Sequence, residues 1–172
     1  MKTFENKTVL ITGGTSGIGK ATALAFAQEG ANVVISGRRV AEGEELAKKI
    51  TSAGGSALFE RADVAREDDI VALVEKTVGT FGGLHIAFNN AGAEGQFGLL
   101  TTEQTVEHYH QVCDINIRGV LLSVATSASR LIGLRRQQVR CHRPHQDGRA
   151  RVRQTGHPCQ QCLSRPDPNR NV

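Results

Sequence analysis

The sequence predicts an α/β fold over residues 1–125: a doubly wound parallel sheet, incomplete at about four strands, followed by a disordered tail. Short β-branched runs alternate with helical patterns of about a dozen residues. A glycine-rich loop joins the first run to the first helix. After Leu134 the alternation stops, and the remaining residues are rich in Pro, Arg, Gln and His.

The predicted elements follow one another in a regular order. Strands are expected at 8–11, 32–36, 57–59 and 84–88, and helices at 20–29, 41–53, 67–80 and 103–125. The helix at 67–80 places its aliphatic residues along one face, namely Ile70, Val71, Leu73, Val74 and Val78. The helix at 103–125 is broken in register near 114–119. Because alternating strands and helices form parallel units with right-handed crossovers, a ligand crevice is expected at the carboxyl ends of the strands.

The loop at residues 12–19 has a glycine pattern with a chemical meaning. Gly13, Gly17 and Gly19 follow a strand and open a helix. Glycines in this context let the backbone turn tightly and approach a pyrophosphate, whose charge is stabilised by the free N–H groups and positive dipole end of the helix. The loop therefore predicts a Rossmann-type dinucleotide site that includes Gly13, Thr15, Ser16, Gly17, Ile18 and Gly19. The alternative is a structural turn into a helix.

Three further motifs follow the Gly-x-x-x-Gly-x-Gly loop. They are Asp63-Val64, Asn89-Asn90-Ala91-Gly92 and Asn116-Ile117-Arg118-Gly119. Over roughly residues 4–122 the sequence resembles the short-chain dehydrogenase/reductase family. The resemblance implies an NAD(P)-dependent oxidoreductase that transfers hydride to or from an alcohol or carbonyl substrate. It implies diphosphate contacts from residues 13–18, adenine contacts from Asp63 and Val64, and ribose-side contacts from Asn90. It further implies cofactor contacts from Ala91 and Gly92, and a place for Asn116 in a catalytic Asn-Ser-Tyr-Lys group.

The end of the second predicted strand indicates the choice of cofactor. In such folds a carboxylate there binds the ribose hydroxyls, whereas a cation binds a 2′-phosphate. Here Gly37 stands at the family's acidic position, and Arg38 offers a bidentate donor for a phosphate. NADP(H) is therefore expected as the preferred cofactor, with NAD possible. The alternative is that Arg38 and Arg39 are solvated surface charges.

The catalytic part of the family pattern is missing. The family's proton donor is a Tyr whose pKa is lowered by a Lys four residues later, while a Ser holds the substrate oxygen. Tyr109 is the single tyrosine and lies before Asn116, and no lysine follows Lys76. Ser123 has neighbours like those of the family's serine but comes too soon after Asn116. We expect no appreciable turnover, and we expect His85, where relatives usually carry Asp, to be structural.

The basic character of the chain belongs to its tail. Residues 1–134 carry a net charge of −3 and residues 135–172 a net charge of +7, the latter with nine Arg and no Lys. With few aliphatic and no aromatic residues, the tail cannot bury enough apolar surface to offset its ordering entropy. Residues 126–172 are therefore expected to be irregular and disordered.

A one-base shift of the reading frame accounts for this tail. If residues 134–140 are encoded as CTA CGC CGC CAG CAA GTA CGC, the shifted frame reads Tyr-Ala-Ala-Ser-Lys-Tyr-Ala, which contains the family's Tyr-x-x-x-Lys. From Gly156 the same shift permits Gly-Ile-Arg-Val-Asn-Ser-Val, which resembles the family's segment after its sixth strand. The hypothesis is an out-of-frame translation from about residue 134, preceded by loss of a stretch near 122–123. The coding DNA tests it.

The tail also has other interpretations. Cys159 and Cys162, with His142, His145 and His157, have ligand-like spacing for zinc, but there is no second Cys-x-x-Cys, so no metal site is predicted. The arginines could bind nucleic acid, without sequence specificity. For the whole chain, the alternatives to an oxidoreductase are a nucleotide-binding fragment without catalysis and an unstable product with an exposed apolar sheet edge.

The sequence predicts a cytoplasmic protein. No apolar run is long enough to cross a bilayer, and the N-terminus lacks the apolar core of a secretory signal. The four cysteines are therefore expected to be thiols rather than disulfides. A dinucleotide and a small alcohol or carbonyl compound are the expected partners, with no membrane and no specific nucleic acid. The substrate and the oligomeric state stay open.

Overall fold

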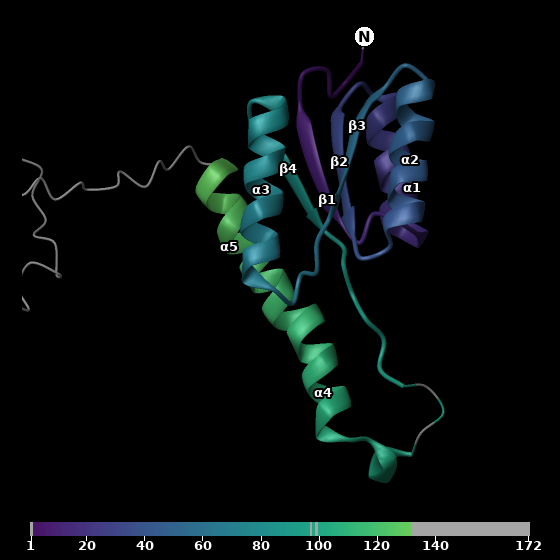
Figure 1. Ribbon diagram of the computed structural model, residues 1–172, viewed down its shortest axis with the longest axis vertical. Helices are drawn as coiled ribbons and strands as arrows, with labels where there is room; N and C mark the ends of the chain where they lie inside the picture. Colours follow the sequence, from purple (N-terminus) through teal and green to yellow (C-terminus); the bar gives the residue numbers. More distant parts are fainter. Residues whose placement is uncertain (1, 97, 99, 132–172) are drawn as a thin grey trace, which may run out of the picture. The chain divides into compact units, whose positions relative to one another are not determined.

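The structure is a computed structural model that describes residues 2–96, 98 and 100–131. Within them lies a parallel sheet in the order β3-β2-β1-β4 (Figure 1). The strands are β1 (Thr8–Thr12), β2 (Asn32–Gly37), β3 (Ser56–Arg61) and β4 (Ile86–Asn89). The helices are α1 (Gly17–Gln28), α2 (Val40–Ser52), α3 (Glu67–Phe81), α4 (Val106–Cys113) and α5 (Gly119–Leu131). A 3-10 turn covers Thr101–Glu103. The predicted α/β fold class is confirmed.

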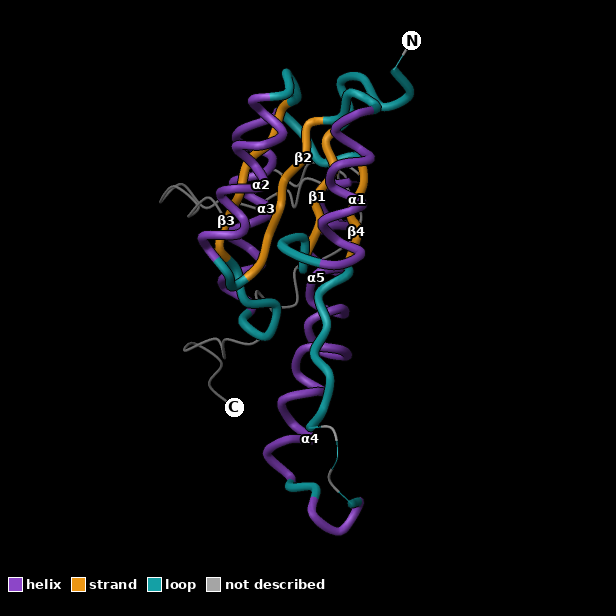
Figure 2. The backbone as a smooth tube through the Cα atoms, turned by 90° about the vertical axis from the view of Figure 1, so that its right-hand side faces the viewer, coloured by secondary structure: helices purple, strands orange, loops and turns teal. Residues whose placement is uncertain are grey.

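The two central strands are buried on both faces. On one face Val9, Ile11, Val33 and Ile35 pack against residues of α1 and α2, which include Ala23, Leu46 and Ile50. On the other face Leu10 and Val34 pack against Leu73 and Val74 of α3. Figures 1 and 2 show the strands as one layer with helices on both sides. Such burial explains why these strands are near-continuous aliphatic runs in the sequence.

Two helices differ in detail from the prediction. The helix expected at 20–29 begins at Gly17, so the last glycines of the loop form its first turn. In α3 the expectation of one aliphatic face was wrong for Val71, whose side chain is 38% exposed. The buried face takes Thr77 instead, because residues at helical spacing from Ile70 and Leu73 point the same way. The Thr77 hydroxyl donates to the Leu73 carbonyl at 2.8 Å.

The helix expected at 103–125 is divided where its register breaks. A π-helical turn (Asp114–Arg118) separates α4 from α5, which confirms the predicted break. The predicted bounds were wrong at both ends. Thr105 caps α4, since its hydroxyl accepts the His108 N–H at 3.3 Å, and α5 continues to Leu131. Residues 126–131 are thus helical rather than irregular. Their contacts with the rest of the fold continue to the end of α5, since Ser127 is buried and Arg130 lies 3.5 Å from Glu75 of α3.

The predictions made for residues 132–172 lie outside the described residues. They are the disorder of the tail, the shifted reading frame, the nucleic-acid contacts and the excluded zinc ligands Cys159 and Cys162. Within the described residues Cys113 is a free thiol, and no three possible metal ligands gather. None of the described helices combines the length and apolar character needed to cross a bilayer.

Candidate functional site

A cleft of about 620 Å³ opens at the carboxyl ends of the strands. The register pairs Thr12 with Ser36 on one side and with Asn89 on the other, so the segments after β1, β2 and β4 leave the sheet at one edge. The sheet order reverses there, as predicted for the crevice. The volume lies within the usual range of small-molecule sites.

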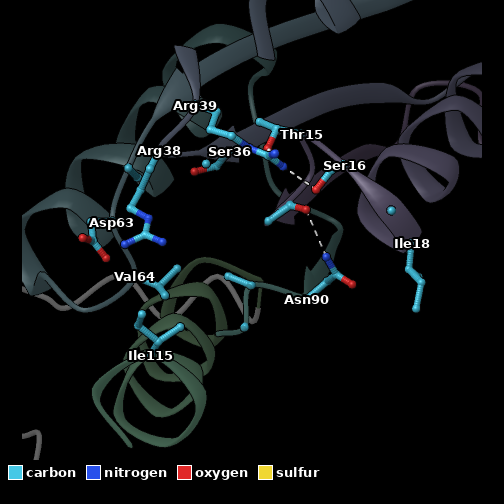
Figure 3. Close-up of a pocket in the computed structure, with 16 residues that line it drawn as sticks. Thr15, Ser16, Ile18, Ser36, Arg38, Arg39, Asp63, Val64, Asn90 and Ile115 are labelled. Carbon is cyan, nitrogen blue, oxygen red and sulfur yellow. Dashed lines mark hydrogen bonds between the residues drawn. The ribbon is translucent and has the colours of Figure 1, made fainter. Parts of the chain in front are cut away.

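The cleft gathers most of the predicted cofactor residues (Figure 3). Those in its lining are Gly13, Thr15, Ser16, Gly17, Ile18, Arg38, Asp63, Val64, Asn90, Ala91 and Gly92. Gly19, Asn116 and Ser123 are not in the lining. The sequence analysis missed four lining residues, which lie in β2, the turn after β2, the turn before α3 and the π-helical turn, namely Ser36, Arg39, Ala62 and Ile115. The contacts of these residues with a cofactor stay a prediction.

The glycines of the loop have different tasks. A Cβ atom at Gly13, whose φ is +65°, would lie 2.7 Å from the Ala91 Cα, and one at Gly19 would collide with the Gly13 carbonyl. These two glycines let the loop, the first turn of α1 and the segment after β4 pack together. At Gly17, whose φ is +50°, no atom lies within 4 Å of such a Cβ. Gly17 therefore leaves space in the cleft for a ligand.

The N-terminus of α1 faces the cleft, and no capping side chain or acidic residue of its first turn offsets its positive dipole end. Ser16 occupies the N-cap position but makes no side-chain capping hydrogen bond, and the first turn contains no acidic residue. The first N–H groups of a helix have no partner inside the helix, and its dipole is positive at this end. This end of the cleft therefore suits an anion such as a phosphate.

Two neighbouring arginines take different positions at the cleft. Arg39 reaches from the turn after β2 to the glycine loop, where it donates to the Thr15 hydroxyl at 3.1 Å and to the Ser16 hydroxyl. Arg38 has no hydrogen bond or ion pair among the described residues, and in Figure 3 its guanidinium points toward Asp63. The sequence pattern indicated Arg38 alone. Arg39 was missed because its contacts lie on another loop.

Thr12 and Asn90 tie the two walls of the cleft together. The Thr12 hydroxyl accepts the backbone N–H groups of Asn90 and Ala91, both at 3.2 Å. The Asn90 amide donates to the Gly13 carbonyl at 3.1 Å (Figure 3). The Asn90 side chain is thus engaged in holding the loops. Thr12 was predicted as the first residue of the loop, but its hydrogen bonds to the segment after β4 were not predicted.

None of the catalytic candidates is placed to donate a proton to a ligand in the cleft. Asn116 forms two hydrogen bonds of 2.8 Å with the backbone of Ala93, accepting its N–H and donating to its carbonyl. The Ser123 hydroxyl is buried without a hydrogen-bond partner among the described residues. Tyr109 is 65% exposed on α4, and hydrogen bonding with the Cys113 thiol raises its pKa, whereas a proton donor of this type needs a lowered pKa.

His85 has the structural role that was expected. Its Nδ1 atom accepts the N–H of buried Thr8 at 3.0 Å, and its backbone N–H donates to the Thr8 carbonyl at 2.9 Å. His85 thus extends the pairing of β1 and β4 at the end of the sheet away from the cleft.

The comparison with protein families establishes the family of this chain. Residues 7–139 match the family model described as short chain dehydrogenase. The chain belongs to the short-chain dehydrogenase family. Members of this family are oxidoreductases that use NAD(P), and the resemblance predicted from the motifs is confirmed.

Similar proteins include dehydrogenases of ring alcohols. Cyclohexanol dehydrogenase from Acinetobacter sp. (strain SE19) is 43% identical over 121 residues, which are 70% of this chain and 48% of that protein. A 2,5-dichloro-2,5-cyclohexadiene-1,4-diol dehydrogenase from Sphingobium indicum is 42% identical over 71% of this chain and 47% of its own length. The chain thus spans about half the length of the curated relatives it matches.

Solved structures agree with the fold. A 3-ketoacyl-ACP reductase from Sinorhizobium meliloti 1021 has a TM-score of 0.71 and 36% identity, over 74% of this chain and 49% of that one. A short-chain dehydrogenase/reductase of unknown function from Caenorhabditis elegans, solved with its cofactor, has a TM-score of 0.70 and 38% identity, over 76% of this chain and 50% of that one.

Proposed function

We propose that the described residues form the cofactor-binding part of an NADP(H)-preferring short-chain oxidoreductase, and that this chain alone binds the cofactor without appreciable turnover. The observation that carries the proposal is the cleft itself, in which an uncapped helix N-terminus and two arginines surround open space beside Gly17. No carboxylate stands at the end of β2, where one would repel a 2′-phosphate.

The residues present fit a phosphorylated dinucleotide. Gly17 and the N–H groups of the first turn of α1 would hold the diphosphate. Arg38 and Arg39, the latter with the Thr15 and Ser16 hydroxyls, would hold the 2′-phosphate through charge-assisted hydrogen bonds. When bound, the nicotinamide ring of such a cofactor gives or takes a hydride. The chain's own residues would bind and orient the molecule.

Titration calorimetry with NADPH and NADH tests the cofactor preference. We expect NADPH to bind at least about tenfold more tightly, a difference of about 1.4 kcal/mol. Arg38→Ala and Arg39→Ala should each weaken NADPH binding and leave NADH binding nearly unchanged. Arg130→Ala on α5, which removes an exposed arginine outside the cleft lining, is the matched control. Equal affinities would contradict the NADP(H) preference, and no binding of either compound would contradict the proposed function.

Hydride transfer is tested with NADPH and a panel of ketones that includes cyclohexanone, because similar proteins are named for alcohols on six-membered rings. We expect no oxidation of NADPH above background. Tyr109 is the single tyrosine, and its exposure and raised pKa make it unsuited as the proton donor. No lysine follows Lys76. Turnover that depends on the ketone would overturn the proposed inactivity.

A further inference from the structure

The turn between β3 and α3 forms the wall of the cleft that carries Asp63 and Val64. Within this turn the backbone N–H of Asp63 donates to the Asp69 carboxylate at 2.9 Å. Asp69 belongs to the first turn of α3, and its side chain is only 19% exposed. We infer that Asp69 is a positioning residue that sets the adenosine end of the cofactor site by holding the Asp63 peptide. This inference rests on the proposed function.

One carboxylate connects three parts of this wall. Besides the Asp63 N–H, Asp69 lies 3.5 Å from the Arg61 guanidinium at the end of β3 and 3.4 Å from the Arg66 guanidinium before α3. A negative charge is also favourable at the N-terminus of a helix. The two arginines and the helix dipole hold Asp69 in place, so its hydrogen bond fixes the Asp63 peptide rather than following it.

Val64 and Ala65, further along the turn, have contacts of their own that do not involve the Asp69 side chain. Val64 is buried with Ile70 and Ile115, and the Ala65 carbonyl accepts a hydrogen bond from Arg118 at 3.2 Å. Removing the Asp69 acceptor should therefore free the Asp63 peptide while Val64 and Ala65 stay in place, so that the effect is confined to the wall of the cleft.

The orientation of the Asp63 peptide determines where the Asp63 carboxylate lies in the cleft. One oxygen of this carboxylate accepts the Ala65 N–H at 3.1 Å, which leaves the other oxygen for the cleft. In Figure 3 this carboxylate lies on the side of the cleft to which Arg38 points. Rotation of the Asp63 peptide would change the place of this carboxylate, while Val64 stays packed against Ile70 and Ile115.

The test uses the full chain and NMR titration with two probes, 2′,5′-ADP and inorganic pyrophosphate. Asp69→Leu removes the acceptor and should weaken 2′,5′-ADP at least about tenfold. Asp69→Asn keeps an acceptor oxygen and should stay within about threefold of the original affinity. Pyrophosphate, which needs only the helix end, should bind all variants alike. Asp68→Leu, an exposed neighbour in the same helical turn, is the control for lost charge.

The amide of Asp63 gives a readout without ligand. Its hydrogen exchange should become faster in Asp69→Leu and remain slow in Asp69→Asn. An Asp69→Leu variant that binds 2′,5′-ADP like the original chain overturns this inference alone. Equal weakening of both probes assigns Asp69 a merely structural role and also overturns it. If the original chain binds neither probe, the proposed function fails and this inference with it.

Discussion

Gly13 and Gly17 belong to one loop, yet the missing side chain serves a different purpose at each. At Gly13 the Ala91 backbone already occupies the space that a Cβ would need, whereas at Gly17 that space is open. A glycine pattern in a sequence does not distinguish these roles. The distinction separates residues that shape the cleft from those that leave it empty.

Alanine at each position should separate stability from binding. Gly13→Ala should lower the free energy of unfolding by about 2–4 kcal/mol, since the methyl group would lie 2.7 Å from the Ala91 Cα and φ is +65°. Gly17→Ala meets no atom, so only its positive φ costs about 1–2 kcal/mol, but its methyl group stands where a phosphate would lie. Urea denaturation and NADPH titration measure the two effects.

The expected order is clear for both measurements. Gly13→Ala should be the less stable variant, and Gly17→Ala should lose more affinity for NADPH than its loss of stability accounts for. A Gly17→Ala chain that binds NADPH like the original would contradict the assignment of this position to the phosphate contact.

At the scale of elements, the sequence predicts what depends on neighbours along the chain. Strand β2 was predicted to within one residue, because a short aliphatic run such as the one in residues 32–36 is typical of a buried strand. The glycine loop was placed because strand, loop and helix are consecutive. Contacts between distant segments were not predicted: Arg39 reaches Thr15 across 24 positions, and Thr12 reaches Asn90 across 78.

The π-helical turn shows the same limit from another side. The broken periodicity near 114–119 indicated that the helix changes register but not how. Asn116 hydrogen-bonds to the Ala93 backbone, and Gly119 closely approaches the turn at Val64. Both partners lie far from the π-helical turn in the sequence. Their positions depend on the packing of β4 and α3, which no local pattern contains.

The close approach of α5 to this turn gives a prediction about an element. A Cβ at Gly119 would lie 2.9 Å from a Val64 methyl and 3.0 Å from the Val64 carbonyl oxygen. Gly119→Ala should therefore push α5 from the cleft wall and lower the free energy of unfolding by about 1–3 kcal/mol, measured by urea denaturation.

Gly79→Ala is the matched control for this helix substitution. Gly79 lies inside α3, and nothing stands within 4 Å of its would-be Cβ. Alanine should raise the free energy of unfolding by about 0.5–1 kcal/mol there, because it is the better helix former. If Gly119→Ala is as stabilising as Gly79→Ala, the contact between α5 and Val64 is not close in solution.

At the scale of the whole molecule, burial is concentrated in the sheet. The segments at Val9–Ile11 and Val33–Ile35 are almost fully buried, while α4 has no buried residue. Large apolar side chains are exposed along α4 and its continuation, at Val106, Tyr109, Ile117, Leu121 and Val124. Exposed apolar side chains lower solubility where they form a large patch. Such exposure does not by itself prevent the sheet from folding.

Amide hydrogen exchange distinguishes a folded cofactor domain from an unstable product. We expect the slowest exchange at residues 9–11 and 33–35, where the central strands are covered on both faces, and fast exchange throughout α4. NADPH at about 100 times its dissociation constant should add about 2.7 kcal/mol to the protection of the slowest amides, since it binds only the folded state. Rapid exchange in all segments, unchanged by NADPH, would mean that this chain does not hold the sheet on which the cleft depends.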